Sequence, residues 1–170
     1  NRFMMYYCEM PLTKTFAYDC VKPNGYNCMV AVQIKDGENQ EDSAIWDKAT
    51  SERGALAGTL FRAETVDIER GELIQLPNPL ITEGIRPGTN FSKLDERGII
   101  KIGSIVERGD AVVAKVLQNS DNKYYEFTNK TVVYKLDEPA RVIKIKEVRG
   151  PKAELFIIIK YEYYRTFKNG

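Results

Sequence analysis

The chain has 170 residues, a formal net charge of +1, 43% hydrophobic residues and 29% charged residues, a composition that indicates a folded globular protein and excludes a disordered one. No apolar run approaches the roughly 18 residues of a membrane-spanning helix, and the first residues lack the pattern of a signal peptide. Histidine is absent, which excludes Ser-His-Asp triads, Cys-His dyads and histidine zinc sites; any catalysis must use carboxylates, Lys, Arg, Tyr or a bound metal.

The elements predicted for the first half are mostly strands. Residues 27–34 form a short β-branched run after the turn residues Pro-Asn-Gly, and residues 43–46 predict a second strand. Residues 48–54 predict a short helical turn that ends at Gly54. Residues 58–69 predict another strand, and the Pro- and Gly-rich residues 76–90 predict a loop.

The second half predicts hairpins. Residues 98–117 contain two short strands around a tight turn at 107–110, and the polar residues 119–126 predict a hairpin tip. Residues 140–165 alternate apolar and polar side chains around an Arg-Gly-Pro-Lys turn, which predicts a long hairpin. The run at 156–159 is apolar on both faces and predicts a central strand. Helix content should be low.

The three cysteines, Cys8, Cys20 and Cys28, have neither the spacing of a zinc ribbon nor the even number of a disulfide framework. We therefore expect a reducing, intracellular location: the cytoplasm or nucleoid of a host cell, or a virion. Because the first residue is Asn rather than Met, we expect a fragment or a processed product.

Charge is divided along the chain. Residues 36–72 carry ten acidic and four basic residues, whereas residues 139–170 carry eight basic and three acidic ones. Such a chain could hold a metal ion at one end and a polyanion at the other, although two solvated faces are the plainer interpretation. The adjacent carboxylates Glu41 and Asp42, beside Gln40, could hold a hard cation such as Mg²⁺; the alternative is an exposed acidic turn.

The acidic pair belongs to a longer pattern in residues 24–54, "NGYNCMVAVQIKDGENQEDSAIWDKATSERG". A turn precedes a Val-Ala strand, then an Asn-Gln-Glu-Asp-Ser motif and a Glu-Arg-Gly turn. This pattern resembles the second-largest, or β-type, subunit of multisubunit DNA-directed RNA polymerases. The matching residues are Asn27, Val30, Ala31, Gly37, Asn39, Gln40, Glu41, Asp42, Ser43, Lys48, Glu52, Arg53 and Gly54. Glu38 departs from the pattern, because the family usually has an aromatic residue there.

Three further blocks agree in order and spacing. Residues 92–116 resemble the family's Lys-Leu-Asp stretch and the strand near its flap or wall, with Ala114 in place of the usual Gly before Lys115. Residues 1–16 and 156–170 resemble the segments that begin and end this region. The motif forms resemble eukaryotic, archaeal or viral members more than bacterial ones, and the short flap and divergent substitutions favour a virus or large phage.

The resemblance implies a mainly β fold. Residues 1–78 would be the hybrid-binding region with the first part of a double-psi β-barrel, and residues 79–135 a small β-rich flap or wall lobe. Residues 136–170 would be barrel strands that lead to the active centre. The family completes this barrel with sequence beyond Gly170.

The resemblance also implies a part in nucleotidyl transfer. Asp42, and secondarily Glu41, would bind the Mg²⁺ that arrives with the nucleoside triphosphate, while the largest subunit holds the first Mg²⁺. Arg165, Lys168 and Gln40 would contact nucleotide or RNA phosphates. The implied partners are the largest subunit, other polymerase subunits or the remaining parts of this subunit, template DNA, the RNA transcript and the triphosphate, with no membrane.

One consequence of this assignment can be tested. The chain alone should be inactive, because its role needs the other polypeptides. The rival hypothesis is a non-catalytic β-barrel interaction or assembly module of a viral particle, which explains the hairpins but makes the order of the four blocks a coincidence.

Some aromatic and charged residues have simpler predicted roles. Trp46 should be a core anchor rather than a base-stacking platform, and the tyrosines at 161, 163 and 164 should form one buried and one exposed row. Arg53 should pair locally with Asp47 or Glu52. Lys93 and Asp95 should belong to a turn.

Overall fold

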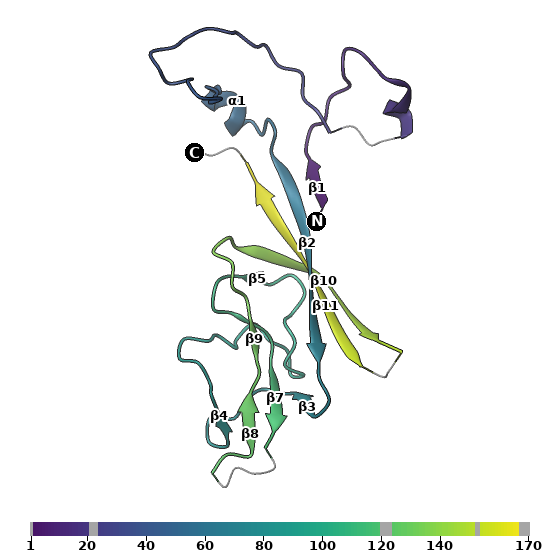
Figure 1. Ribbon diagram of the computed structural model, residues 1–170, viewed down its shortest axis with the longest axis vertical. Helices are drawn as coiled ribbons and strands as arrows, with labels where there is room; N and C mark the ends of the chain where they lie inside the picture. The colour runs from purple at the N-terminus through teal and green to yellow at the C-terminus, as the bar shows by residue number, and fades with distance from the viewer. Residues whose placement is uncertain (1, 21–23, 120–123, 152–153, 167–170) are drawn as a thin grey trace. The chain divides into compact units, whose positions relative to one another are not determined.

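The computed structural model describes residues 2–20, 24–119, 124–151 and 154–166, and these are mainly β structure (Figure 1). The helical elements described are a 3-10 turn, η1 (Phe16–Cys20), and one short helix, α1 (Lys48–Glu52). Neither has the length and hydrophobicity of a membrane-spanning helix. The strands are β1 (Arg2–Met5), β2 (Gly58–Ile68), β3 (Glu72–Ile74), β4 (Thr82–Glu83), β5 (Ile105–Val106), β6 (Ala111–Val113), β7 (Lys115–Gln118), β8 (Phe127–Asn129), β9 (Val132–Val133), β10 (Ala140–Arg149) and β11 (Leu155–Arg165).

The chain divides into two compact units, one formed by Phe61–Tyr163 and the other by Arg2–Leu60 with the chain from Tyr164 onward. Strands β2 and β11 pass from one unit into the other. The largest sheet has the order β1-β2-β11-β10-β5, and a second sheet has the order β3-β7-β8-β4. Strands β6 and β9 form a separate pair. This division reflects contacts between residues and does not test the functional boundaries predicted after residues 78 and 135, which stay predictions.

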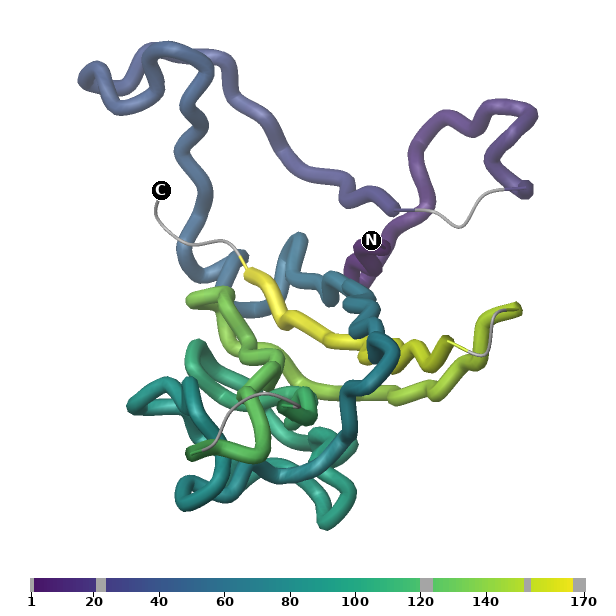
Figure 2. The backbone as a smooth tube through the Cα atoms, turned by 60° about the horizontal axis from the view of Figure 1, so that its bottom comes forward, coloured from purple at the N-terminus to yellow at the C-terminus, as the bar shows by residue number. Residues whose placement is uncertain are grey.

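The hairpin of β10 and β11 confirms the alternation read from the sequence, and its two strands run side by side in Figure 2. Val142 pairs with Tyr161 and Ile145 with Ile159, while a bulge interrupts the register between Val142 and Lys144. Strand β11 lies between β2 and β10. This central position explains why the run at 156–159 is apolar on both faces, as predicted.

Three tyrosines belong to the core of the unit formed by Phe61–Tyr163. Tyr134, Tyr161 and Tyr163 are each at most 3% exposed. The Tyr161 hydroxyl donates to Glu64 Oε2 at 2.9 Å, and the Tyr134 hydroxyl donates to the Glu138 carbonyl at 2.7 Å. Burial is the main reason why the pKa values of Tyr134 and Tyr161 are raised. Tyr161 and Tyr163 are thus core residues and Tyr164 is exposed, as the predicted rows require.

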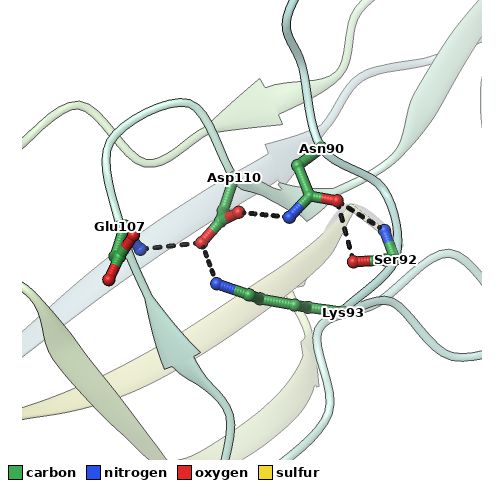
Figure 3. A network of polar contacts seen from close by, with 5 residues as sticks. All are labelled: Asn90, Ser92, Lys93, Glu107 and Asp110. Atoms are coloured by element: carbon green, nitrogen blue, oxygen red, sulfur yellow. Dashed lines mark hydrogen bonds and ion pairs between the residues drawn. The ribbon is translucent and has the colours of Figure 1, made fainter.

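Asp110, in the tight turn after β5, is buried and is the centre of a polar network (Figure 3). Its carboxylate accepts hydrogen bonds from Lys93 Nζ at 2.6 Å, from the Glu107 amide at 2.7 Å and from Asn90 Nδ2 at 2.7 Å. Burial alone would raise the pKa of Asp110, but these hydrogen bonds outweigh burial and hold the pKa below its ordinary value. The network joins the loop at 90–93 to the turn at 107–110.

The Asp110→Asn variant should lose about 1–3 kcal/mol of stability, because the new amide cannot accept all three hydrogen bonds. The lowered pKa sets the pH dependence. In the native chain this stabilisation is present above the ordinary carboxylate pKa of about 3.9 and is lost as the pH falls through the lower folded-state value. Urea denaturation across that range should show the loss for the native chain and a flatter profile for the variant. Equal profiles would mean that the carboxylate does not stabilise this junction.

Two predicted strands are absent. Residues 27–34 and 43–46 have no regular secondary structure. The side chains of Met29, Val30, Val32 and Ile34 are each at least 75% exposed. High β-propensity produces a strand only where a neighbouring strand supplies hydrogen bonds and packing, and no described strand pairs with these residues. The strands predicted at residues 27–34 and 43–46 are therefore wrong.

Candidate functional site

The acidic pair lies in a turn built on the side chain of Asn39. Asn39 Oδ1 accepts a hydrogen bond from the Lys35 amide at 3.0 Å, and Asn39 Nδ2 donates to the Gln33 carbonyl. The Glu38 amide donates to the Lys35 carbonyl at 2.8 Å. A short amide side chain can replace backbone partners in this way, which is why Asn is common in turns. Asn39 thus closes the first half of the turn.

Ser43 closes the second half. Its hydroxyl lies 3.0 Å from the Glu38 carbonyl and 2.6 Å from the Gln40 carbonyl, so that its single proton is shared between these two acceptors. Its amide donates to the Gln40 carbonyl at 3.2 Å. Ser43 therefore fixes the backbone on both sides of the acidic pair.

The backbone of the pair itself is left-handed, with φ of 53° at Glu41 and 67° at Asp42. Residues other than glycine are uncommon in this region, and Asp and Asn tolerate it better than most. Both side chains are exposed. Neither carboxylate forms a hydrogen bond or an ion pair within the part of the chain that the structure describes. The turn therefore presents two uncommitted carboxylates.

The structure places three of the five predicted site residues in this one turn. Gln40, Glu41 and Asp42 are consecutive and exposed. Arg165 is exposed at the end of β11, in a different element. Lys168 lies outside the described residues.

Helix α1 follows the turn and begins at a capping aspartate. The Asp47 carboxylate accepts a hydrogen bond from the Thr50 amide at 2.7 Å, the usual arrangement at a helix N-terminus. Hydrogen bonds from the Thr50 hydroxyl and amide lower the pKa of Asp47. Arg53 Nη2 lies 4.0 Å from Asp47 Oδ2, which confirms the predicted local pairing. Gly54 then has φ of 94° and ends the helical turn, as predicted.

Trp46 is not the core anchor that its size predicted. It is half-buried, with its ring 6.4 Å from the ring of Tyr26, and it is not among the fully buried residues. The surroundings of a large aromatic residue depend on contacts that no local pattern specifies.

The turn predicted at Lys93 and Asp95 is confirmed, because Asp95 Oδ1 accepts hydrogen bonds from the Arg97 and Ile99 amides at 3.0 and 2.8 Å.

Asn39 and Ser43 hold the turn of the candidate site, and sequence reasoning did not single them out for a role. The signal was present, because an Asn and a Ser flank the acidic pair in a Gly-containing turn, and both residue types form hydrogen bonds to nearby backbone. The resemblance identified them as matching positions only.

Ser43→Ala should loosen the turn by about 1 kcal/mol, because the hydroxyl contacts to two carbonyl groups are lost. Hydrogen exchange of the Ser43 and Glu38 amides should become several-fold faster. Ser43→Thr keeps the hydroxyl and is the control, with exchange expected to stay near the native rate. Unchanged exchange in Ser43→Ala would show that the hydroxyl does not hold the turn.

The donor set suits a hard divalent cation. Mg²⁺ prefers oxygen ligands and is commonly bound through one or two carboxylates together with substrate phosphates. Glu41 and Asp42 supply such oxygens on successive, exposed residues. Within the described ranges no group of three or more Asp, Glu or Cys side chains comes together as a metal-binding cluster. The pair therefore fits a metal ion that is shared with other ligands.

Comparison with known proteins decides the family. The model of "RNA polymerase Rpb2, domain 6" matches residues 1–170. This chain belongs to the Rpb2 domain 6 family. The second-largest-subunit resemblance seen in the four sequence blocks is thereby confirmed.

Relatives of this Rpb2 domain come from several lineages. The chain is 31% identical over 180 residues to DNA-directed RNA polymerase I subunit RPA135 of Saccharomyces cerevisiae, an alignment that covers 95% of this chain and 14% of the relative. It is 31% identical over 157 residues to the probable RNA polymerase II subunit RPB2 homolog of Invertebrate iridescent virus 6, covering 84% of this chain and 13% of the relative. With RNA polymerase D subunit 2b of Arabidopsis thaliana it shares 27% identity over 166 residues, which is 86% of this chain and 15% of the relative. The chain therefore spans about one-seventh of the length of these relatives.

Proposed function

We propose that this chain acts as part of a DNA-directed RNA polymerase, in which Asp42 and Glu41 help to position the Mg²⁺ that accompanies the incoming nucleoside triphosphate. One observation carries this proposal: both carboxylates are exposed and uncommitted within the described residues, in a turn that two other side chains hold in place. The family match favours a polymerase subunit over a viral assembly module.

The chain's own residues provide the ligands and their support. Asp42 and Glu41 supply negatively charged oxygens, and Ser43 and Asn39 fix the backbone from which these oxygens project. When bound, the metal neutralises charge on the triphosphate and stabilises the leaving pyrophosphate. Few protein oxygens suit a metal that must leave with the product, because a full protein cage would hold it too tightly. Arg165, Lys168 and Gln40 would contact nucleotide or RNA phosphates.

The remaining parts of the proposal concern the assembly. The first metal ion, and the residues that hold it, would belong to the largest subunit, so this chain should be inactive by itself. The β-rich units would form part of a double-psi barrel and a flap or wall lobe, and would hold the RNA–DNA hybrid through its shape and phosphates. Such contacts should be sensitive to salt and largely independent of sequence.

Asp42→Asn in the assembled polymerase tests the proposal. Asn adopts the left-handed backbone as readily as Asp, so the change removes charge with little disturbance of the turn. The Mg²⁺ concentration for half-maximal elongation should rise on the order of 10- to 100-fold, the usual cost of weakening a metal site. Affinity for the template should change much less.

Glu38→Gln is the matched control, because Glu38 is an exposed carboxylate of the same turn. Its Mg²⁺ titration should match that of the native enzyme. An Asp42→Asn titration that also matches the native enzyme would remove Asp42 from the metal role.

A further inference from the structure

A pocket of about 370 Å³ lies within the unit formed by Phe61–Tyr163, between the loop that follows β4 and the segment that follows β8. Three basic side chains line it, those of Arg86, Lys130 and Lys135, and no acidic side chain does. The pocket is therefore a concentration of positive charge. It belongs to none of the residues considered above for metal or nucleotide binding.

The three positive charges are not neutralised by neighbours. None of them forms an ion pair within the ranges that the structure describes. The carboxylate of Asp137, two residues from Lys135, is paired instead with Arg108 at 2.7 Å. All three basic side chains belong to exposed residues, so an anion can reach them.

The walls of the pocket are joined by specific contacts. Asn129 Nδ2 donates to the Gly84 carbonyl at 3.2 Å, which ties one wall to the other. The Thr131 amide and hydroxyl donate to Asn129 Oδ1 at 3.2 and 2.6 Å and hold that amide in place. Below these contacts, β4 pairs in parallel with β8, and the two strands lie next to each other in Figure 1. The basic side chains therefore project from a preformed frame.

A neutral donor completes the site. The Thr89 hydroxyl lines the pocket and forms no hydrogen bond to another described residue. An anion with several oxygens could accept from this hydroxyl, from the guanidinium fork and from two ammonium groups together. A phosphoryl group has this character, and Arg and Lys are its usual partners. The volume also leaves room for a sugar attached to the phosphate.

We propose that this pocket binds a phosphoryl group through Arg86, Lys130, Lys135 and Thr89. The phosphoryl group can come from the backbone of a nucleic acid or from a free phosphate or nucleotide. The site goes beyond the metal role of the acidic turn and does not depend on it.

Lysine acylation, read by mass spectrometry on the full-length protein or the assembled polymerase, tests the proposal residue by residue. The probes are inorganic phosphate, ATP without divalent metal and a short oligothymidylate. At least one should protect Lys130 and Lys135, while the exposed Lys101 outside the pocket stays reactive. Protection by oligothymidylate alone identifies a nucleic-acid backbone as the source, and protection by phosphate or ATP identifies a free phosphoryl ligand. Protection should persist in Asp42→Asn, so that failure of the metal role leaves this site standing.

The double variant Arg86→Gln with Lys130→Gln gives the quantitative test. If oligothymidylate is the ligand, loss of two phosphate contacts should lower the slope of log affinity against log salt by about 1.4, since each contact on a single strand contributes about 0.7. If a free phosphoryl group is the ligand, the same variant should abolish its protection of Lys135. The control, Arg70→Gln with Lys101→Gln, removes the same charges from exposed positions outside the pocket.

Three results would overturn the proposal. Equal effects of the two double variants would mean that only net charge matters. Reactive Lys130 and Lys135 with every probe would mean that the pocket binds no phosphoryl group. Protection by polyglutamate but by no phosphate probe would identify a surface for acidic protein segments instead.

Discussion

Lys115→Ala is expected to destabilise the unit formed by Phe61–Tyr163 by about 3–5 kcal/mol, the usual cost of removing one partner of a buried ion pair. Lys115 Nζ lies 2.6 Å from Glu72 Oε2, with side chains only 11% and 4% exposed. The same ammonium donates to the Asp67 carbonyl at 2.9 Å. Lys115 thereby ties β7 to β3 and to the end of β2. Without it, the Glu72 carboxylate would be buried without its counterion.

Hydrogen exchange in the intact protein measures this effect. Amides of β3 and β7 should exchange on the order of 10²- to 10⁴-fold faster in Lys115→Ala, because each 1.4 kcal/mol is a factor of ten. Lys144→Ala is the control, since Lys144 is exposed on β10 and has no ion-pair partner among the described residues. Its effect should stay within about 0.5 kcal/mol. The double change Lys115→Met with Glu72→Leu should recover most of the loss, because it leaves no buried charge unpaired.

Native exchange rates in Lys115→Ala would show that this pair does not stabilise the unit. The result also bears on the role of Lys115 in function. The resemblance placed Lys115 in the strand near the flap, where a lysine could be taken for a nucleic-acid contact. Its burial against Glu72 makes it a structural residue of this unit.

Local patterns predicted the hairpin of β10 and β11 and two of the turns; the strands β5 and β6 beside the turn at 107–110 pair with β10 and β9 and not with each other. The alternation in β10 and β11, the tight turn at 107–110 and the stop at Gly54 each depend on residues that are neighbours in the sequence or one strand apart. The mainly β character and the low helix content follow from the same signals. The barrel and flap assignments are not reached by these patterns and stay proposals.

Contacts between distant segments were not predictable. Lys115 and Glu72 are 43 residues apart, and Lys93 and Asp110 are 17 apart; no periodicity links such pairs. The two strands that are absent have the same cause: the β-propensity of residues 27–34 does not specify a strand with which they could pair. Burial of Trp46 was overestimated for a similar reason.

The candidate site was predicted in part. Family motifs led directly to Gln40, Glu41 and Asp42, and the structure places them in one exposed turn. The supporting contacts of Asn39 and Ser43 needed coordinates, because they join side chains to particular carbonyl groups. The pocket with Arg86, Lys130 and Lys135 also needed coordinates, since its two walls, at residues 84–89 and 129–135, are far apart in the sequence.

Asp42→Cys should make the polymerase dependent on a soft metal. A thiolate is a poor ligand for Mg²⁺ and a good one for thiophilic ions such as Cd²⁺. With Mg²⁺ alone, the metal requirement should rise on the order of 10- to 100-fold, as for Asp42→Asn. A small amount of Cd²⁺ should then restore elongation by occupying the site through the new sulfur atom. Asp42→Ser is the matched control, because it has the same shape with an oxygen in place of sulfur.

Metal rescue tests the central claim most directly, because it depends on contact between the side chain at position 42 and the metal. The account predicts that Cd²⁺ restores elongation by Asp42→Cys and leaves Asp42→Ser and Glu38→Cys unaffected. If Cd²⁺ changes Asp42→Cys and Asp42→Ser equally, or restores neither, residue 42 does not touch the metal and the proposed role is wrong.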